Sequence, residues 1–89
     1  MMDNTFQHIA DEVRRFLATE VRPNRNPEFY DDDRALISSG LLDSVAMARL
    51  ITFLEGSRDV EFYAHELSVQ YMDNVGMIAN TVLEKLGEA

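Results

Sequence analysis

Residues 40–55 read GLLDSVAMARLITFLE, a stretch that joins a helix start to an apolar helix face. Asp43 and Ser44 are residue types that cap the N-terminal end of a helix. Gly56 and Ser57 follow the stretch and favour a helix end. We therefore predict a helix that begins at Ser44 and stops at Gly56 and Ser57. Its buried face repeats at steps of three and four residues, at Met47, Leu50, Ile51 and Leu54.

The same spacing predicts a helix on each side of this one. In the first helix Asp11, Glu12, Arg14 and Arg15 should face water, and its apolar face comprises Phe6, Ile9, Ala10, Val13, Phe16, Leu17 and Val21. The last helix should be capped by Asp73. Its apolar residues are Val75, Ile78, Ala79, Val82, Leu83 and Leu86. Only a short helical turn fits between the second and last helices, around Ala64 to Leu67.

A long connection separates the first two helices. Pro23 and Pro27, with Asn24 and Asn26 between them, end the first helix. A loop of about twenty residues is uncommon unless it is functional or packed by its own apolar side chains. We expect it to wrap the bundle through Phe29, Leu36, Ile37, Leu41 and Leu42. The fold class predicted for residues 1–89 is a single all-α domain, an antiparallel bundle of three main helices plus one short helix.

The composition disfavours several classes of function. The 89 residues carry 16 acidic and 8 basic side chains, for a formal net charge of -8. This acidity disfavours binding to nucleic acid and favours basic protein surfaces. No apolar run is long enough for a membrane span and the N-terminus lacks the pattern of a signal peptide, so we expect a cytoplasmic protein. Cysteine is absent, which removes thiolate metal ligands and cysteine nucleophiles.

Ser44 is the candidate functional residue. A serine at the start of a helix lies among backbone N–H groups that lack intrahelical partners, at the positive end of the helix dipole. A phosphodiester on Ser44 Oγ would be favoured there, as phosphates are at other helix N-termini. The simpler interpretation is that Asp43 and Ser44 only cap the helix, because both types are preferred at that position.

The wider sequence favours the functional interpretation. Residues 40–45 resemble the attachment motif of the acyl carrier protein family. That motif is a glycine, two variable residues, an aspartate, a serine and an aliphatic residue, and here Gly40, Asp43 and Ser44 occupy its fixed positions in order. The chain resembles that family over nearly its whole length, including the long loop and the DVEF segment at 59–62. The resemblance implies that Ser44 receives 4'-phosphopantetheine from coenzyme A through a phosphopantetheinyl transferase. It also implies loading by an adenylating ligase or acyltransferase, delivery to downstream acyl-accepting enzymes, and no catalysis by the protein itself.

Departures from the family pattern indicate the subtype. Fatty-acid carriers have many glutamates on the helix that follows the serine, whereas the corresponding outward face here is nearly neutral. Discrete aminoacyl, D-alanyl or specialised polyketide-type carriers are therefore more similar. The residues expected to recognise partners are Leu42, Asp43, Val45, Ala48, Arg49 and Thr52, with Glu55 at the end of the same face. Met47 could also line a slot between helices that shelters an acyl chain.

Other chemistry has weaker support. Asp31, Asp32 and Asp33 lack the alternating spacing of a calcium loop and are expected to form a solvated acidic segment. His8 and His65 lie far apart without further ligands, so we predict surface residues and no metal site. A hydrolytic triad built on Ser44 lacks a strained nucleophile turn. The main alternative is a small helical adaptor that binds a partner and carries no prosthetic group.

Overall fold

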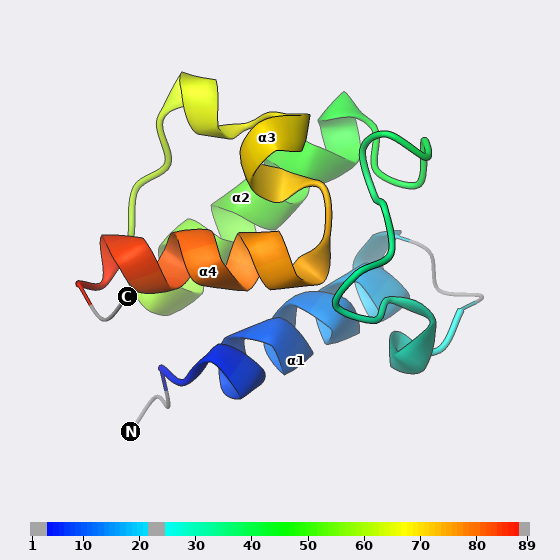
Figure 1. The fold of residues 1–89 in the computed structure, drawn as a ribbon, viewed down its shortest axis with the longest axis horizontal. Helices are drawn as coiled ribbons and strands as arrows, with labels where there is room; N and C mark the ends of the chain where they lie inside the picture. The colour runs from blue at the N-terminus through cyan, green and yellow to red at the C-terminus, as the bar shows by residue number, and fades with distance from the viewer. Residues whose placement is uncertain (1–3, 22–24, 88–89) are drawn as a thin grey trace.

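The computed structural model describes residues 4–21 and 25–87, and this part of the chain is helical without β-strands. Its α-helices enclose a common apolar core (Figure 1). The four α-helices of the described part are α1 (Phe6–Phe16), α2 (Ser44–Arg58), α3 (Val69–Met72) and α4 (Val75–Lys85). The predicted all-α class is thus confirmed as a small helical bundle.

Helix α1 begins where Thr5 caps it, because the Thr5 side chain accepts a hydrogen bond from the His8 N–H at 3.2 Å. The helix continues as π-helical turns over Leu17–Val21. The predicted apolar face is confirmed, with its central residues buried and Phe6, Phe16 and Val21 partly buried. The buried residues of this first helical segment are Ile9, Ala10, Val13, Leu17 and Ala18.

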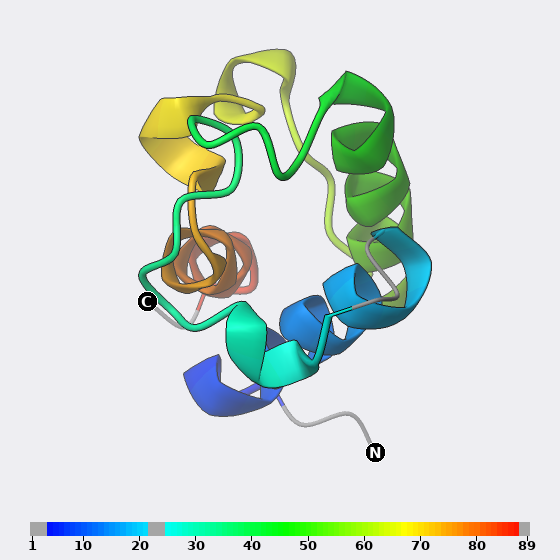
Figure 2. The same cartoon turned by 90° about the vertical axis from the view of Figure 1, so that its right-hand side faces the viewer.

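The connection from α1 to α2 packs onto the bundle as predicted. Its only helical element among the described residues is a 3-10 turn at Pro27–Phe29. From there the chain passes beside α4 and α3 before it enters α2 (Figure 2). Leu36 and Leu42 are buried, as is Tyr30, which the sequence analysis did not select. Pro23 and Asn24, which were expected to end the first helix, lie outside the described residues.

Helix α2 starts at Ser44 as predicted, but its predicted end is wrong. It runs through Gly56 and Ser57 to Arg58, and Asp59 then takes the left-handed conformation at φ 56°. The Asp59 N–H donates to the Glu55 carbonyl at 3.1 Å, which closes the last turn. Aspartate tolerates the left-handed region better than most residues, so a glycine is not required at this position. The four apolar residues predicted for the buried face are all buried.

In the segment before α4, the turn predicted around Ala64 to Leu67 is confirmed as a 3-10 turn at Ala64–Glu66. The short α-helix α3, which was not predicted, follows Ser68, whose backbone is extended at φ -148°. Asp73 does not cap the last helix. Asn74 does so, accepting a hydrogen bond from the Met77 N–H at 2.7 Å.

The helices are not all antiparallel to their neighbours. Helix α1 runs in one sense, and α2 and α4 both run back in roughly the opposite sense (Figure 1). The residues between α2 and α4, including α3, return the chain to the end of the molecule where α2 began. This long return is what allows two main helices to share a direction. The arrangement leaves the start of α2, the long loop and α3 together at one end.

Candidate functional site

Ser44 is the first residue of α2 and is exposed. Asp43 holds the helix start, because its Oδ1 accepts a hydrogen bond from the Ala46 N–H at 2.8 Å and its carbonyl accepts one from the Met47 N–H at 2.8 Å. The hydroxyl of Ser44 has no hydrogen-bond partner among the described residues, and neither do the N–H groups of Ser44 and Val45. An accessible oxygen thus lies beside two unoccupied donors at the positive end of a helix.

The outward face of α2 matches the sequence prediction. Val45 is 69% exposed, the largest fraction among the exposed large apolar residues of the described chain. Ala48, Arg49 and Thr52 are also exposed. Arg49 lies 3.4 Å from Glu20, with both side chains about half exposed, so the two charges largely offset each other on this face. The face that flanks Ser44 is therefore nearly neutral within a strongly acidic protein.

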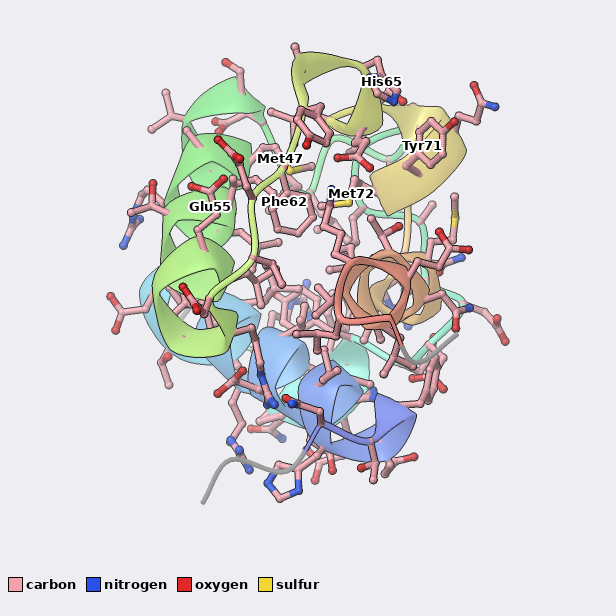
Figure 3. All side chains as sticks on the ribbon, turned by 90° about the vertical axis from the view of Figure 1, so that its left-hand side faces the viewer. Met47, Glu55, Phe62, His65, Tyr71 and Met72 are labelled. Carbon is pink, nitrogen blue, oxygen red and sulfur yellow. The ribbon has the colours of Figure 1, made fainter. Side chains whose placement is uncertain are left out.

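Leu42 and Glu55 do not belong to this exposed surface. Leu42 is only 3% exposed because it packs into the core, and it lines the wall of a pocket. Its contact with partner enzymes stays a prediction. Glu55 is turned toward the segment after α2, where its Oε2 accepts a hydrogen bond from the Phe62 N–H at 3.0 Å. Figure 3 labels Glu55 on α2 and Phe62 on the segment that follows α2.

A pocket of about 310 Å³ opens beside Ser44. Its walls come from three parts of the chain: the long loop, the start of α2 and the segment before α3. Asp43 is the only charged residue in the lining, which is otherwise apolar apart from the Ser44 hydroxyl. The lining residues are Ile37, Leu42, Asp43, Ser44, Met47, Ala48 and Leu67. Met47 thus lines an apolar slot, as expected, although the wall opposite α2 is built by Ile37 and Leu67.

The segment that carries Leu67 is fixed to α4. Lys85 forms an ion pair with Glu66 at 2.5 Å, and both side chains are mostly buried. The Lys85 ammonium also lies 4.8 Å from the centre of the Tyr63 ring and 5.0 Å from that of Phe62. Such contacts add cation–π attraction to the ion pair. The side of the pocket formed by this segment is therefore anchored to α4.

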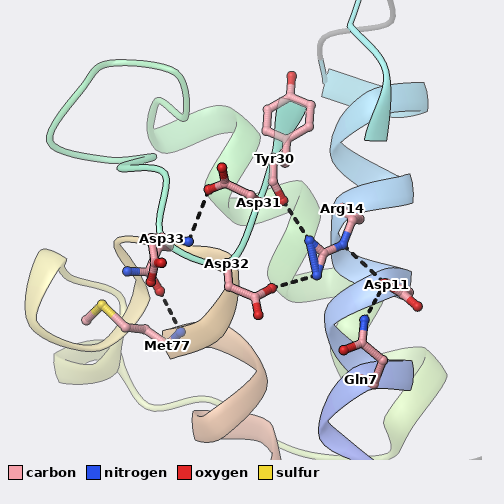
Figure 4. Close-up of polar contacts among 9 residues, drawn as sticks. Gln7, Asp11, Arg14, Tyr30, Asp31, Asp32, Asp33 and Met77 are labelled. Atoms are coloured by element: carbon pink, nitrogen blue, oxygen red, sulfur yellow. Dashed lines mark hydrogen bonds and ion pairs between the residues drawn. The ribbon is translucent and has the colours of Figure 1, made fainter. Parts of the chain in front are cut away.

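The acidic segment lies elsewhere and is only partly solvated. Asp32 accepts a hydrogen bond from Arg14 at 2.6 Å, and Arg14 also contacts Asp11 and the Tyr30 carbonyl (Figure 4). Arg14 is 13% exposed, so the prediction that it faces water is wrong. Buried cations of this kind need such partners. Asp31 and Asp33 are exposed as expected.

Both histidines, His8 and His65, are exposed, in agreement with their prediction as surface residues. His65 lies edge-on to Tyr71, with ring centres 5.9 Å apart, on the outer side of α3 (Figure 3). The described residues contain no cluster of three or more side chains suited to hold a metal ion. None of the helices described is long and apolar enough to cross a membrane.

The structural roles of two polar residues, Arg58 and Asp73, were not predicted from the sequence. Arg58 has a fully buried side chain whose Nε lies 2.9 Å from Glu12 of α1, a residue that was predicted to face water. Asp73 accepts hydrogen bonds from the long loop. These bonds, above all that from the Ser38 N–H, hold the pKa of Asp73 below its ordinary value of 3.8. Neither partner could be found from local sequence, because each contact joins residues more than 30 positions apart.

Comparison with known proteins adds no assignment. The sequence matches no protein-family model and no curated protein. The site must therefore be interpreted from its own geometry: an exposed serine at a helix start, a nearly neutral helix face and an adjacent apolar pocket.

Proposed function

We propose that this chain is a carrier protein of the acyl carrier type, and that Ser44 anchors 4'-phosphopantetheine. The observation that carries the proposal is the exposed Ser44 hydroxyl at the first position of α2, inside the motif formed by Gly40, Asp43 and Ser44. The order of elements also supports it: a first helix, a long packed loop, a helix that starts at the serine, a short helix and a last helix.

The residues around Ser44 fit such a group. A phosphodiester on Ser44 Oγ would lie next to the free N–H groups of Ser44 and Val45, which donate to anions at helix starts. Asp43 Oδ1 accepts a hydrogen bond from the Ala46 N–H, so this carboxylate oxygen is engaged in capping the helix. The exposure of Ser44 leaves space for a transferase to approach.

In the attachment step Ser44 Oγ forms a bond to the phosphorus that carries the pantetheine arm in coenzyme A. The bond from that phosphorus to the bridging oxygen of the pyrophosphate breaks, and adenosine bisphosphate leaves. The hydroxyl proton passes to a base of the transferase, since Ser44 has no base as a hydrogen-bond partner among the described residues. Once attached, the arm supplies a thiol that holds an acid as a thioester, which this cysteine-free chain could not form by itself.

The contribution of the protein is presentation. A tethered acid has a high effective concentration at an enzyme docked on the same surface. The residues proposed to contact partner enzymes are exposed and lie next to Ser44 or further along α2: Asp43, Val45, Ala48, Arg49 and Thr52. These partners are the transferase, the adenylating ligase or acyltransferase, and the acceptor enzymes. Because this face is nearly neutral, discrete aminoacyl, D-alanyl or polyketide-type loading fits it better than docking to a strongly basic fatty-acid synthase surface.

The test is the intact mass of the protein after incubation with coenzyme A and a broad-specificity phosphopantetheinyl transferase. We expect the wild type to gain the mass of one phosphopantetheine group, and Ser44→Ala to fold and gain none. Ser68→Ala is the control, because Ser68 is a partly accessible serine outside the motif, with one weak side-chain hydrogen bond at 3.4 Å to the His65 carbonyl. A wild type that gains no mass would favour the helical adaptor, and modified Ser44→Ala would place the site elsewhere.

A further inference from the structure

The junction between α3 and α4 binds the long loop through one carboxylate. Asp73 Oδ1 accepts hydrogen bonds from the N–H groups of Ile37 at 2.8 Å and Ser38 at 2.9 Å, and a longer one from Leu36 at 3.3 Å. Asp73 Oδ2 accepts from the Ser38 hydroxyl at 2.7 Å. We call these contacts the Asp73 cluster. Together with the 2.7 Å bond from the Leu36 N–H to the Asp73 carbonyl, they join two segments far apart in sequence.

The geometry of the Asp73 cluster is that of an anion bound by a backbone concavity. Consecutive N–H groups that converge on one point form such a site, and hydrogen bonds to a charged acceptor are roughly twice as strong as neutral ones. Asn74 already satisfies the helix start beside it, so Asp73 is not needed as a cap. The carboxylate is therefore committed to the loop.

The loop held in this way leads directly to Ser44. The Leu36 carbonyl accepts a hydrogen bond from the Leu42 N–H at 3.0 Å, which closes the loop immediately before the helix start. Within it Gly40 adopts φ +82°, a conformation that disfavours other residues. Leu36 and Leu42 are both buried, so the two ends of this closed loop are fixed in the core.

The same loop also forms one wall of the pocket beside Ser44. Ile37, whose N–H binds Asp73, lines that pocket together with Leu42. Loss of the carboxylate would leave the N–H groups of Ile37 and Ser38 without their acceptor and would free the Ser38 hydroxyl. The Leu36 N–H would keep only its 2.7 Å bond to the Asp73 carbonyl. The loop segment 36–42 would then exchange among several conformations, and the entry to α2 would move with it.

We propose that Asp73 is a positioning residue for Ser44, because it holds the loop that sets the start of α2 and the wall of the adjacent pocket in the form that the modifying enzyme binds. This inference rests on the proposed function. Asp73 does not touch the reacting atoms and acts through Leu36, Ile37 and Ser38.

The experiment measures KM and kcat for the transfer of phosphopantetheine from coenzyme A to the unmodified 89-residue chain. We expect Asp73→Ala to raise the KM for the chain about tenfold, the factor that corresponds to about 1.4 kcal/mol, with little change in kcat. Asp73→Asn keeps one acceptor oxygen, but its amide nitrogen cannot accept the hydrogen bond from the Ser38 hydroxyl. Its KM should therefore lie between those of the wild type and Asp73→Ala. Ser38→Ala, which removes only the hydroxyl, should have the smallest effect.

Asn74→Ala is the matched control. It removes the 2.7 Å cap bond to the Met77 N–H at the same junction, and so lowers stability, but leaves the Asp73 cluster in place. Its KM should equal that of the wild type at temperatures where all variants are folded. Amide hydrogen exchange should accelerate at Ile37, Ser38 and Leu42 in the Asp73 variants and not in Asn74→Ala.

The outcomes separate the two proposals. A wild-type KM in Asp73→Asn and Asp73→Ala overturns the positioning role while leaving Ser44 as the modified residue. An equal rise in KM for Asn74→Ala assigns the effect to general stability, which also overturns it. If the wild type takes up no group at all, the proposed function fails and the positioning role fails with it. Should Asp73→Ala not fold, Asp73→Asn and Ser38→Ala decide between these results.

Discussion

The ion pair between Glu12 and Arg58 joins α1 to the end of α2 and offers the sharpest test of what holds the bundle together. The Arg58 side chain is fully buried, and that of Glu12 is 19% exposed. Arg58 Nε donates to Glu12 Oε1 at 2.9 Å, and its Nη1 donates to Asn4 Oδ1 at 2.7 Å. The perturbation is Glu12→Gln, which keeps the size of the side chain and an acceptor oxygen but removes the negative charge.

The loss of stability expected for Glu12→Gln follows from the burial of the ion pair. At 2.9 Å and an effective dielectric constant of about 20, the Coulomb attraction is about 6 kcal/mol, most of which offsets the desolvation of Arg58. Removal of one partner of a buried pair costs about 3–5 kcal/mol, because the other charge stays buried. Glu12 is partly exposed and glutamine retains a hydrogen bond, so we expect a loss of about 2–3 kcal/mol in the free energy of unfolding. For a chain of this length the melting temperature should fall by roughly 10–20 °C.

The assay is urea and thermal unfolding followed by circular dichroism. Glu20→Gln is the matched control, because Glu20 also pairs with an arginine of α2, but at 3.4 Å with both side chains about half exposed. An exposed pair contributes about 0–1 kcal/mol, so this variant should remain close to the wild type. If Glu12→Gln costs no more than Glu20→Gln, burial does not make the Arg58 pair important and the reasoning is refuted.

Four further outcomes concern single residues. Asp43→Ala removes the cap of α2 and should lower the free energy of unfolding by about 1 kcal/mol in urea titrations, and an unchanged midpoint would contradict the cap geometry. Gly56→Ala should raise it by up to about 1 kcal/mol, since a Cβ there meets no atom within 4 Å, and a loss of stability would show that the helix does not continue through this position. Asp59→Gly should also stabilise, by roughly 0.5–1 kcal/mol, because glycine relieves the left-handed backbone; a destabilised variant would indicate a different helix end. The pKa of Asp73 is lower in the folded state than its ordinary value of 3.8, so in acid the unfolded state binds more protons than the folded state. The contribution of Asp73 to stability is therefore present above pH 3.8 and is lost as the pH falls through the pKa of the folded state. We expect the free energy of unfolding of Asp73→Asn to depend less on pH than that of the wild type between about pH 2 and 5.

Much of the local structure could be predicted from short-range patterns. The spacing of Met47, Leu50 and Leu54 defines a buried face whatever the neighbouring helices do, and all three are buried. Asp43 satisfies its own helix through a bond only three residues long, so the start of α2 follows from local chemistry. The exposed position of Ser44 follows from both, because it lies at the start of the helix and off its apolar face.

The ends of the helices and the roles of several charged residues depended on distant partners. Helix α2 continues past Gly56 to Arg58, whose guanidinium finds Glu12 on another helix, and no local rule predicts that pairing. Asp73 resembles a helix cap in sequence, yet its carboxylate binds the loop at Ser38 while its neighbour Asn74 takes the cap. Aspartate and asparagine are both suitable N-caps, and Asn74 rather than Asp73 takes this role because the loop approaches Asp73.

The sequence by itself therefore determined where the apolar helix faces lie and where the candidate serine is exposed, since periodicity and capping act over one or two turns. Tertiary structure alone decided the shared direction of α2 and α4, the buried place of Leu42 and Arg58, and the hold of Asp73 on the loop before Ser44. The physical reason is that a buried charge or a free backbone N–H takes whatever partner the packed chain brings within about 3 Å, however far apart the two are in sequence.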